Sequence, residues 1–291
     1  MKKMYFRAHF IPITKKPMPR WYITAVSFVM KKCLFVLSAL VLFAFSSCQK
    51  YAGDPVTKEF PIDGTYTELE VAGAFVVTVS DAATAITVTV GENVMPNVKV
   101  ENVEGKLKIY LKPAINISGP NEMAVILPYN ANLTHVDLSG ASEFRSAYRL
   151  EGHEVEVDLS GNSGFYCDIE ADEIDMELSG TSYAEGFVDA SDFDLNMSGG
   201  SEATLRGQAT TLDLALSGAS TIKRTITGSN YGLECDFCNG TMSGGSVAYI
   251  HCNTKVNVIL SGTSELHFTG DGDSTSSQTS GGSRIIHDEQ P

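Results

Sequence analysis

A Ser-Gly-x-Ser turn recurs along the chain after a short apolar stretch, and it constrains the fold more than any other feature. Two copies read Val-Asp-Leu-Ser-Gly-Ala-Ser at 136–142 and Val-Asp-Leu-Ser-Gly-Asn-Ser at 157–163. The first serines are Ser139, Ser160, Ser179, Ser198, Ser217, Ser243 and Ser261, and a last copy without its strand begins at Ser280. The spacings are 21, 19, 19, 19, 26, 18 and 19 residues, so the repeat is about nineteen residues long, with one longer copy.

Each repeat predicts a strand that ends in a tight corner. Apolar residues alternate with polar ones before the serine, as at Ile174, Met176 and Leu178, which is typical of a strand with one buried face. A glycine follows each first serine and permits a positive φ at the corner. These corner glycines are Gly140, Gly161, Gly180, Gly199, Gly218, Gly244 and Gly262. The second serine of each turn predicts a ladder of hydroxyls that donate along the stack or to backbone carbonyls.

The length of the repeat selects the architecture. Propeller blades need about 40–50 residues, and leucine-rich repeats need a consensus that is absent. Hairpins of a β-sandwich, the ordinary alternative, would not recur with the same tetrapeptide. About nineteen residues fit one turn of short strands stacked about 4.8 Å above the next turn. The sequence therefore predicts an all-β, single-stranded parallel β-helix, a solenoid.

Residues 56–130 lack the serine motif and predict irregular N-terminal capping turns over the exposed end of the solenoid. Alternation predicts strands in this region at 67–71, 75–79, 86–90, 98–100, 107–111 and 123–127. Val71-Ala72-Gly73-Ala74-Phe75 resembles a degenerate corner. We expect residues 49–57 to be a tether, residues 58–285 to be the β-helix head domain and residues 286–291 to be a tail.

The N-terminal region predicts a lipoprotein signal peptide over residues 30–48. Lys31 and Lys32 precede an apolar run that ends in Phe45-Ser46-Ser47-Cys48, where small residues before a cysteine indicate lipidation of Cys48. The alternative is an uncleaved transmembrane helix, but Lys31 and Lys32 divide the apolar stretch into halves shorter than the roughly 20 residues a span needs. Residues 1–29 are interpreted as a spurious upstream extension, with Met30 as the start; whether translation starts at Met1 or Met30 stays open.

Charge is distributed unevenly along the chain. Residues 1–48 hold eight of the 21 Lys and Arg and none of the 35 Asp and Glu. The remaining chain is strongly acidic, and such a body repels nucleic acid and anionic lipid at long range. We therefore expect no nucleic-acid partner; the expected partners are the membrane, through the lipid, and a glycan or protein ligand of the envelope or of a host.

The lipobox, the strand-rich lead and the tandem Leu-Ser-Gly-x-Ser turns together resemble the GIN domain family, the head domain of auto-transporter adhesins, formerly a domain of unknown function. The resemblance covers residues 56–285. This family is common in Bacteroidetes-type bacteria. The resemblance implies a right-handed β-helix in the cell envelope and no catalytic residues to carry over.

Three constellations of side chains bear on chemistry. The serines are periodic and the histidines lie at unrelated phases of the repeat, so a Ser-His-Asp triad is not expected. Asp137, Asp158 and Glu177 share one phase of successive repeats and predict an outward acidic column. This column is a solvated face or a weak cation site, since carboxylates suit Ca²⁺.

The cysteines leave several readings open. Cys235-x-x-Cys238, with Cys252 and Cys167, could be buried core thiols, one structural disulfide, or a zinc or redox site. A spacing of three along a strand predicts that Cys235 and Cys238 point to opposite faces, and no helix follows to lower a thiol pKa. We expect core thiols or one disulfide, no metal and no cofactor.

These observations predict a non-enzymatic, adhesin-like binding or scaffolding lipoprotein of the outer membrane, facing the periplasm or exposed at the surface. The alternative is a polysaccharide-active enzyme, a lyase or hydrolase, with a groove along one sheet. An enzyme would show non-periodic Asp, Glu, Arg or aromatic residues clustered in a concavity, whereas a scaffold would show flat, periodic faces.

Overall fold

The computed structural model describes residues 50–291, except residues 63, 114–116, 119–122, 228–229 and 290–291. The predicted signal peptide, Cys48 and residues 1–29 lie outside the described residues. The described chain is all-β, with a short 3-10 turn, η1 (Met95–Asn97), as its helical element. Most strands belong to one large mixed sheet of 20 strands.

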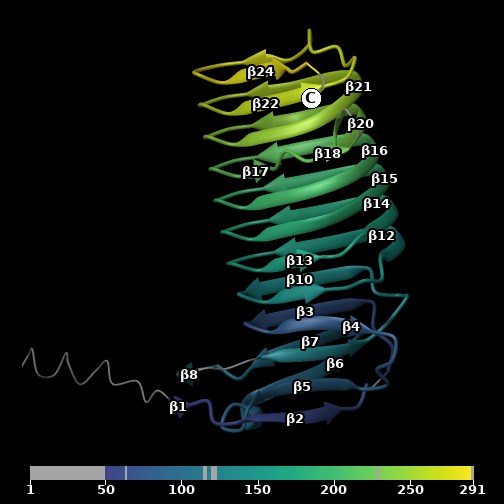
Figure 1. Ribbon diagram of the computed structural model, residues 1–291, viewed down its shortest axis with the longest axis vertical. Helices are drawn as coiled ribbons and strands as arrows, with labels where there is room; N and C mark the ends of the chain where they lie inside the picture. The colour runs from purple at the N-terminus through teal and green to yellow at the C-terminus, as the bar shows by residue number, and fades with distance from the viewer. Residues whose placement is uncertain (1–49, 63, 114–116, 119–122, 228–229, 290–291) are drawn as a thin grey trace, which may run out of the picture. The chain divides into compact units, whose positions relative to one another are not determined.

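Parallel pairing between successive repeats organises the chain from β10 (His135–Gly140) onward. In β14 (Ile169–Leu178), β15 (Tyr183–Met197) and β16 (Glu202–Leu216) the register is constant, so that Ile174 pairs with Phe193 and Phe193 with Leu212. Figure 1 shows these strands stacked in chain order toward the C-terminus. A second series of parallel pairs follows each corner, and the remaining strands of both series are β11 (Glu143–Arg145), β12 (Leu150–Leu159), β13 (Gly164–Tyr166), β17 (Thr221–Ile222), β20 (Leu233–Met242), β21 (Val247–Leu260), β22 (Glu265–Thr269), β23 (Gln278–Thr279) and β24 (Arg284–His287).

The lead before β10 contains antiparallel pairs that the serine repeats lack. Its strands are β1 (Lys50–Tyr51), β2 (Pro55–Phe60), β3 (Glu68–Gly73), β4 (Val76–Ser80), β5 (Ile86–Gly91), β6 (Val98–Val103), β7 (Lys106–Leu111), β8 (Ile117–Ser118) and β9 (Ala124–Pro128). β2 pairs antiparallel with β5, β5 with β9, and β6 with β7, whereas β3 and β4 pair in parallel with the first repeat strands β10 and β11. All six strands expected in this region are present.

Two chain segments differ from the expected boundaries. Residues 55–57, expected in the tether, begin β2, where antiparallel pairing with β5 satisfies backbone groups of that strand. Residues 286 and 287, expected in the tail, complete β24, which pairs in parallel with β22.

The core consists of the inward-facing residues of each repeat, which are aligned from one strand to the next. Val157, Met176, Leu195 and Leu214 occupy one register position on neighbouring strands and are buried. Burying such side chains supplies about 25 cal/mol per Å² of apolar surface and fixes the register, since a one-residue slip would turn them to solvent. The long repeat between Ser217 and Ser243 accommodates its extra residues in an antiparallel pair, β18 (Ile226–Thr227) with β19 (Asn230–Tyr231).

Candidate functional site: an acidic sheet face

The serine–glycine corners hold neighbouring repeats at close range. The seven corner glycines have φ between 71° and 78°. A Cβ on Gly161 would lie 2.5 Å from the carbonyl oxygen of Gly140, and one on Gly180 would lie 2.4 Å from that of Gly161. The residue after each glycine donates its N–H to the same carbonyl, as Thr181 does to Gly161 at 2.7 Å. Glycine is required here by both conformation and space.

The serines of the repeat make hydrogen bonds to the backbone. The hydroxyl of Ser179 donates to the carbonyl of Leu159 at 3.2 Å, and that of Ser160 lies 3.5 Å from the carbonyl of Leu138. The second serines are buried, and Ser163 donates to the carbonyl of Ser160 at 2.9 Å. Ser139, Ser198, Ser217, Ser243 and Ser261 occupy the equivalent half-buried corner position. These contacts give the serines a structural role at the corners.

One outward sheet face carries carboxylates in three rows. In the first row Asp137, Asp158 and Glu177 are register partners, as expected from their shared phase. The second row continues from Glu156 through Asp175 and Asp194 to Asp213, and the third contains Glu154, Glu173 and Asp192. We call these ten residues the acidic face: Asp137, Glu154, Glu156, Asp158, Glu173, Asp175, Glu177, Asp192, Asp194 and Asp213.

The sequence reasoning identified the first row as a column and did not single out the second and third. The signal was present in the repeat itself, because Asp175, Asp194 and Asp213 follow one another at spacings of 19 residues. Equal spacing in a regular repeat places side chains on the same file of the sheet. Any residue type that recurs at the repeat length therefore forms a row.

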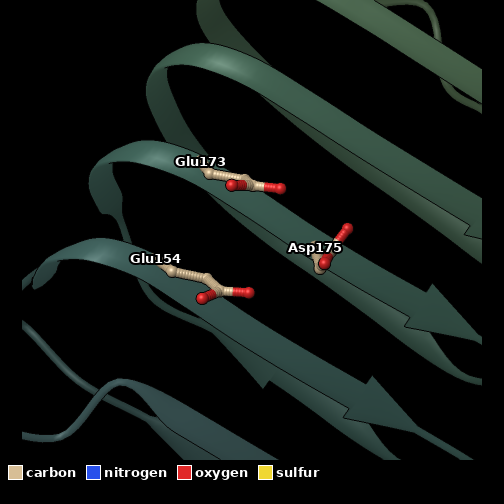
Figure 2. A group of neighbouring side chains, drawn as sticks. All are labelled: Glu154, Glu173 and Asp175. Carbon is tan, nitrogen blue, oxygen red and sulfur yellow. The ribbon is translucent and has the colours of Figure 1, made fainter.

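The closest approach of carboxylates joins two rows. Glu154, Glu173 and Asp175 each place one carboxylate oxygen within 4.8 Å of the other two. Among the described residues, this is the group of three His, Cys, Asp or Glu side chains that come so close together. Figure 2 shows Glu154 on one strand and Glu173 and Asp175 on the adjacent strand. Oxygen ligands of this kind suit Ca²⁺ or Mg²⁺. The expected cation column of Asp137, Asp158 and Glu177 does not form such a group, and cation binding there stays a prediction.

Burial and neighbouring like charges both act on two carboxyl groups of the acidic face. Burial, together with the neighbouring charges of Glu70 and Asp158, raises the pKa of Asp137 above its ordinary value. Burial and the charges of Asp175 and Asp213 likewise raise the pKa of Asp194. Like charges and loss of water both disfavour a carboxylate.

Basic side chains lie at one end of the acidic face. The Nδ1 of His135 lies 2.6 Å from an oxygen of Glu156, and its Nε2 lies 3.4 Å from Asp158. In the lead, Lys106 pairs with Glu68 and Lys108 with Glu70. Within the described part of the chain, Asp175, Asp194 and Asp213 form no ion pair with a lysine or arginine.

A hollow of about 230 Å³ lies on the acidic face. Its lining residues are Glu156, Asp158, Asp175, Met176, Glu177 and Asn196. The lining holds no arginine or aromatic side chain that would position a sugar, and His135 contacts it through Glu156 and Asp158. Most of the residues that line the hollow belong to the periodic rows of the acidic face.

The four cysteines of the described chain are free thiols and buried. The expectation that Cys235 and Cys238 point to opposite faces is wrong: both side chains are buried, as are Ala209 and Leu212 at the same register positions of the preceding repeat, so the alternation is interrupted between these positions. Burial raises the pKa of Cys167 to about 12. Hydrogen bonding to Cys238 first, and then burial, raises the pKa of Cys235, and hydrogen bonding to Cys235 and burial raise that of Cys252.

In the described residues we find no helix of the length and apolar character that a membrane crossing requires. Among curated proteins, none matches the chain. Solved structures share its fold. A "putative adhesin" from Parabacteroides merdae ATCC 43184 is 19% identical, with a TM-score of 0.70, and the match covers 81% of this chain and 97% of that one.

Two structures from Parabacteroides distasonis ATCC 8503 are similar to the same extent. One is a "putative adhesin", 20% identical with a TM-score of 0.67, over 82% of this chain and 97% of that chain. The other is a "putative lipid binding protein", 18% identical with a TM-score of 0.66, over 82% of this chain and 100% of that chain. The family profile described as "Putative auto-transporter adhesin, head GIN domain" matches residues 65–187 and 181–272. Since these matches span more than half of the 291 residues, the chain belongs to this GIN domain family.

Proposed function

We propose that the protein is a non-enzymatic, adhesin-like binding or scaffolding protein of the cell envelope, which presents the acidic face to its ligand. The observation that carries this proposal is the uninterrupted register of carboxylates from Glu156 to Asp213 across four neighbouring strands. A flat file of like charges gives a long, uniform surface for contact. Membership of the adhesin-head family supports a location in the envelope or at the cell surface.

The chemistry of the face favours a binding role over catalysis. General acid–base work needs groups whose environments separate their pKa values, and a site that holds the reacting atoms. The acidic face supplies carboxylates in periodic rows, and the corner serines Ser163 and Ser179 donate to backbone carbonyls. The polysaccharide-active alternative has no observation in its favour.

The ligand that suits the acidic face is a glycan or protein with exposed cationic groups. Rows of carboxylates raise the local concentration of positively charged partners and repel polyanions.

An immobilised-ligand screen tests the function. The full chain is applied to an array of amino-substituted, neutral and acidic glycans and to basic and acidic proteins, and polysaccharides are assayed in parallel for release of reducing ends. We expect salt-sensitive binding to cationic ligands without turnover. Robust turnover of any polysaccharide, or binding restricted to polyanions, would contradict the proposal.

Matched variants connect binding to the acidic face. The triple variant Asp175→Asn, Asp194→Asn and Asp213→Asn removes three charges from the second row. The control Glu59→Gln, Asp271→Asn and Glu289→Gln removes three exposed charges elsewhere. The first variant should lose binding while the control retains it. Equal loss in both would show that net charge, and not the face, recruits the ligand.

We further propose that Cys48 is lipidated and anchors the protein in the outer membrane. The apolar run before Phe45-Ser46-Ser47-Cys48 supports this assignment. Replacing Cys48 by Ala should move the protein from the membrane fraction to the soluble fraction after cell disruption. Retention of the C48A variant on the membrane would exclude the lipid anchor.

The stacked strands are, in our proposal, a single-stranded parallel β-helix of right hand. The constant register of β12, β14, β15 and β16 supports it, because each strand pairs in parallel with the one in the next repeat. Parallel strands joined by crossovers in one sheet are right-handed in nearly all proteins. An electron-density map of the protein that showed left-handed turns would contradict the assignment.

A further inference from the structure

Three buried thiols meet where the repeat is least regular. Cys235 and Cys238 lie on β20 and Cys252 lies on the neighbouring β21. Two thiol pairs include Cys235: one with Cys238 on the same strand and one with Cys252 on the neighbouring strand.

Strand register distinguishes the two pairs. Cys235 and Cys252 are register partners on adjacent parallel strands, and their side chains are 2% and 0% exposed, so both point into the core. Neighbouring strands lie about 4.8 Å apart, within the range of roughly 4.4–6.8 Å between Cα atoms that a disulfide spans. Cys235 and Cys238 are three residues apart on one strand, a separation of as much as about 10 Å where the strand is extended.

We propose that Cys235 and Cys252 form a disulfide that joins two successive turns when the protein folds in the oxidising envelope. This inference rests on the proposed envelope location. Two S–H bonds break and one S–S bond forms; the two electrons and two protons pass to an external disulfide, which becomes two thiols. The oxidant that accepts these electrons is a protein or small-molecule disulfide.

A zinc site is the competing use of these thiols. Within the described residues, the three sulfurs are not among the groups that bring three ligand atoms within 4.8 Å of one another. Zinc binding by three thiolates would need such convergence. Thiol pairing through Cys235 remains the arrangement that the geometry favours.

The position of the cross-link gives it a purpose. The register between β20 and β21 shifts between Cys235 and Phe237, directly after the long excursion that interrupts the repeat. Register is weakly specified where the regular pattern breaks. A covalent bond between Cys235 and Cys252 would fix the pairing at this point. Because burial and thiol–thiol hydrogen bonds raise the pKa of both groups, they react slowly once folded, and the bond forms during folding.

Peptide mapping of the exported full chain tests the proposal. Cells that express it are quenched in acid, the membrane fraction is denatured and alkylated without reductant, and digested peptides are identified by mass. Cleavage beside Asp236 or Phe237 separates Cys235 from Cys238. We expect a peptide with Cys235 linked to one with Cys252, while Cys167 and Cys238 are alkylated. Four alkylated thiols, or a link through Cys238, would overturn the assignment.

Serine variants provide the controls. Cys238→Ser should keep the cross-link, whereas Cys235→Ser and Cys252→Ser should each lose it. The cross-link closes a loop from Cys235 to Cys252, and we expect reduction to lower the Tm of the wild-type protein and of C238S by about 5–10 °C, with no change in C252S. An equal effect of reductant on all three proteins would contradict the proposal.

Fractionation of the same cells separates this inference from the proposed function. Free thiols in protein recovered from the envelope would overturn the disulfide alone. If the protein is found in the cytoplasm, the proposed location fails, and the purified full chain is then unfolded and refolded with oxidised glutathione. Formation of the Cys235–Cys252 link under these conditions supports the inference, and its absence overturns it.

Discussion

A Cβ atom on Gly180 would lie 2.4 Å from the carbonyl oxygen of Gly161 in the preceding turn. Gly180 also has a φ of 74°, a backbone conformation that residues other than glycine rarely adopt. We expect Gly180→Ala to lower the free energy of unfolding by about 2 kcal/mol or more, because strain and a backbone clash add. Chemical denaturation of the purified protein measures the change.

The neighbouring corner position supplies the control for this prediction. A Cβ on Gly200 would have its nearest neighbour 3.9 Å away, and other repeats carry Ala141 or Ala219 there. Gly200→Ala should be neutral or stabilising by about 0.4–1 kcal/mol. If both alanine variants were equally stable, close approach of the corners would not be what requires glycine.

Two phenylalanines stack in successive turns of the core. The rings of Phe144 and Phe165 have centroids 5.7 Å apart and an interplanar angle of 13°. Phe165→Ala should cost about 3–5 kcal/mol, since it leaves a cavity between turns. Phe187 is 46% exposed, so Phe187→Ala should change stability by less than about 1 kcal/mol. Thermal unfolding of both variants makes the comparison, and similar losses would contradict it.

The raised pKa of Asp194 has a defined consequence for stability against pH. Its folded pKa lies above the unfolded one, so the folded state binds more protons between these values, and this group destabilises the fold as pH rises through that range. Asp194→Asn should therefore stabilise the protein at neutral pH, and the advantage should shrink as pH falls through the pKa of Asp194. Denaturation across pH 3–8 checks this; a pH-independent difference would point to packing instead.

The acidic face should respond to ionic strength in general. Screening shortens the range of repulsion among the carboxylates of neighbouring strands, so added salt should raise the Tm. NaCl and CaCl₂ at matched ionic strength are compared on the wild-type protein and on Glu173→Gln, which alters the closest carboxylate group. We expect the two salts to act alike. A gain specific to calcium that vanished in E173Q would instead identify a cation site at Glu154, Glu173 and Asp175.

The repeat alone predicted the strands, the corners and the first row of carboxylates, because each depends on residues at fixed phase. Three features did not follow from it. Cys235 and Cys238 both face the core because the in–out alternation is interrupted between them, as it is between the buried Ala209 and Leu212 at the same register positions of the preceding repeat. Simple alternation holds only within a straight strand.

Contacts between rows were also beyond the reach of the pattern. The repeat assigns Glu154 and Asp175 to different rows. Their carboxylate oxygens come close to that of Glu173 through the directions of the side chains, which the repeat does not specify. The start of strand β2 was missed for a related reason. Most of its residues are exposed, so its sequence shows no buried face, and the strand is defined by its antiparallel pairing with β5.

The constant register of β14, β15 and β16 bears on how such a chain changes over generations. A segment such as 180–198 begins and ends at equivalent points of the structure, so an in-frame duplication or loss of nineteen residues joins surfaces that already fit. Length can then vary in whole turns while every corner keeps its neighbours. A change of another size displaces the inward residues from their row unless the added residues leave the sheet, as the pair β18–β19 does in the 26-residue repeat.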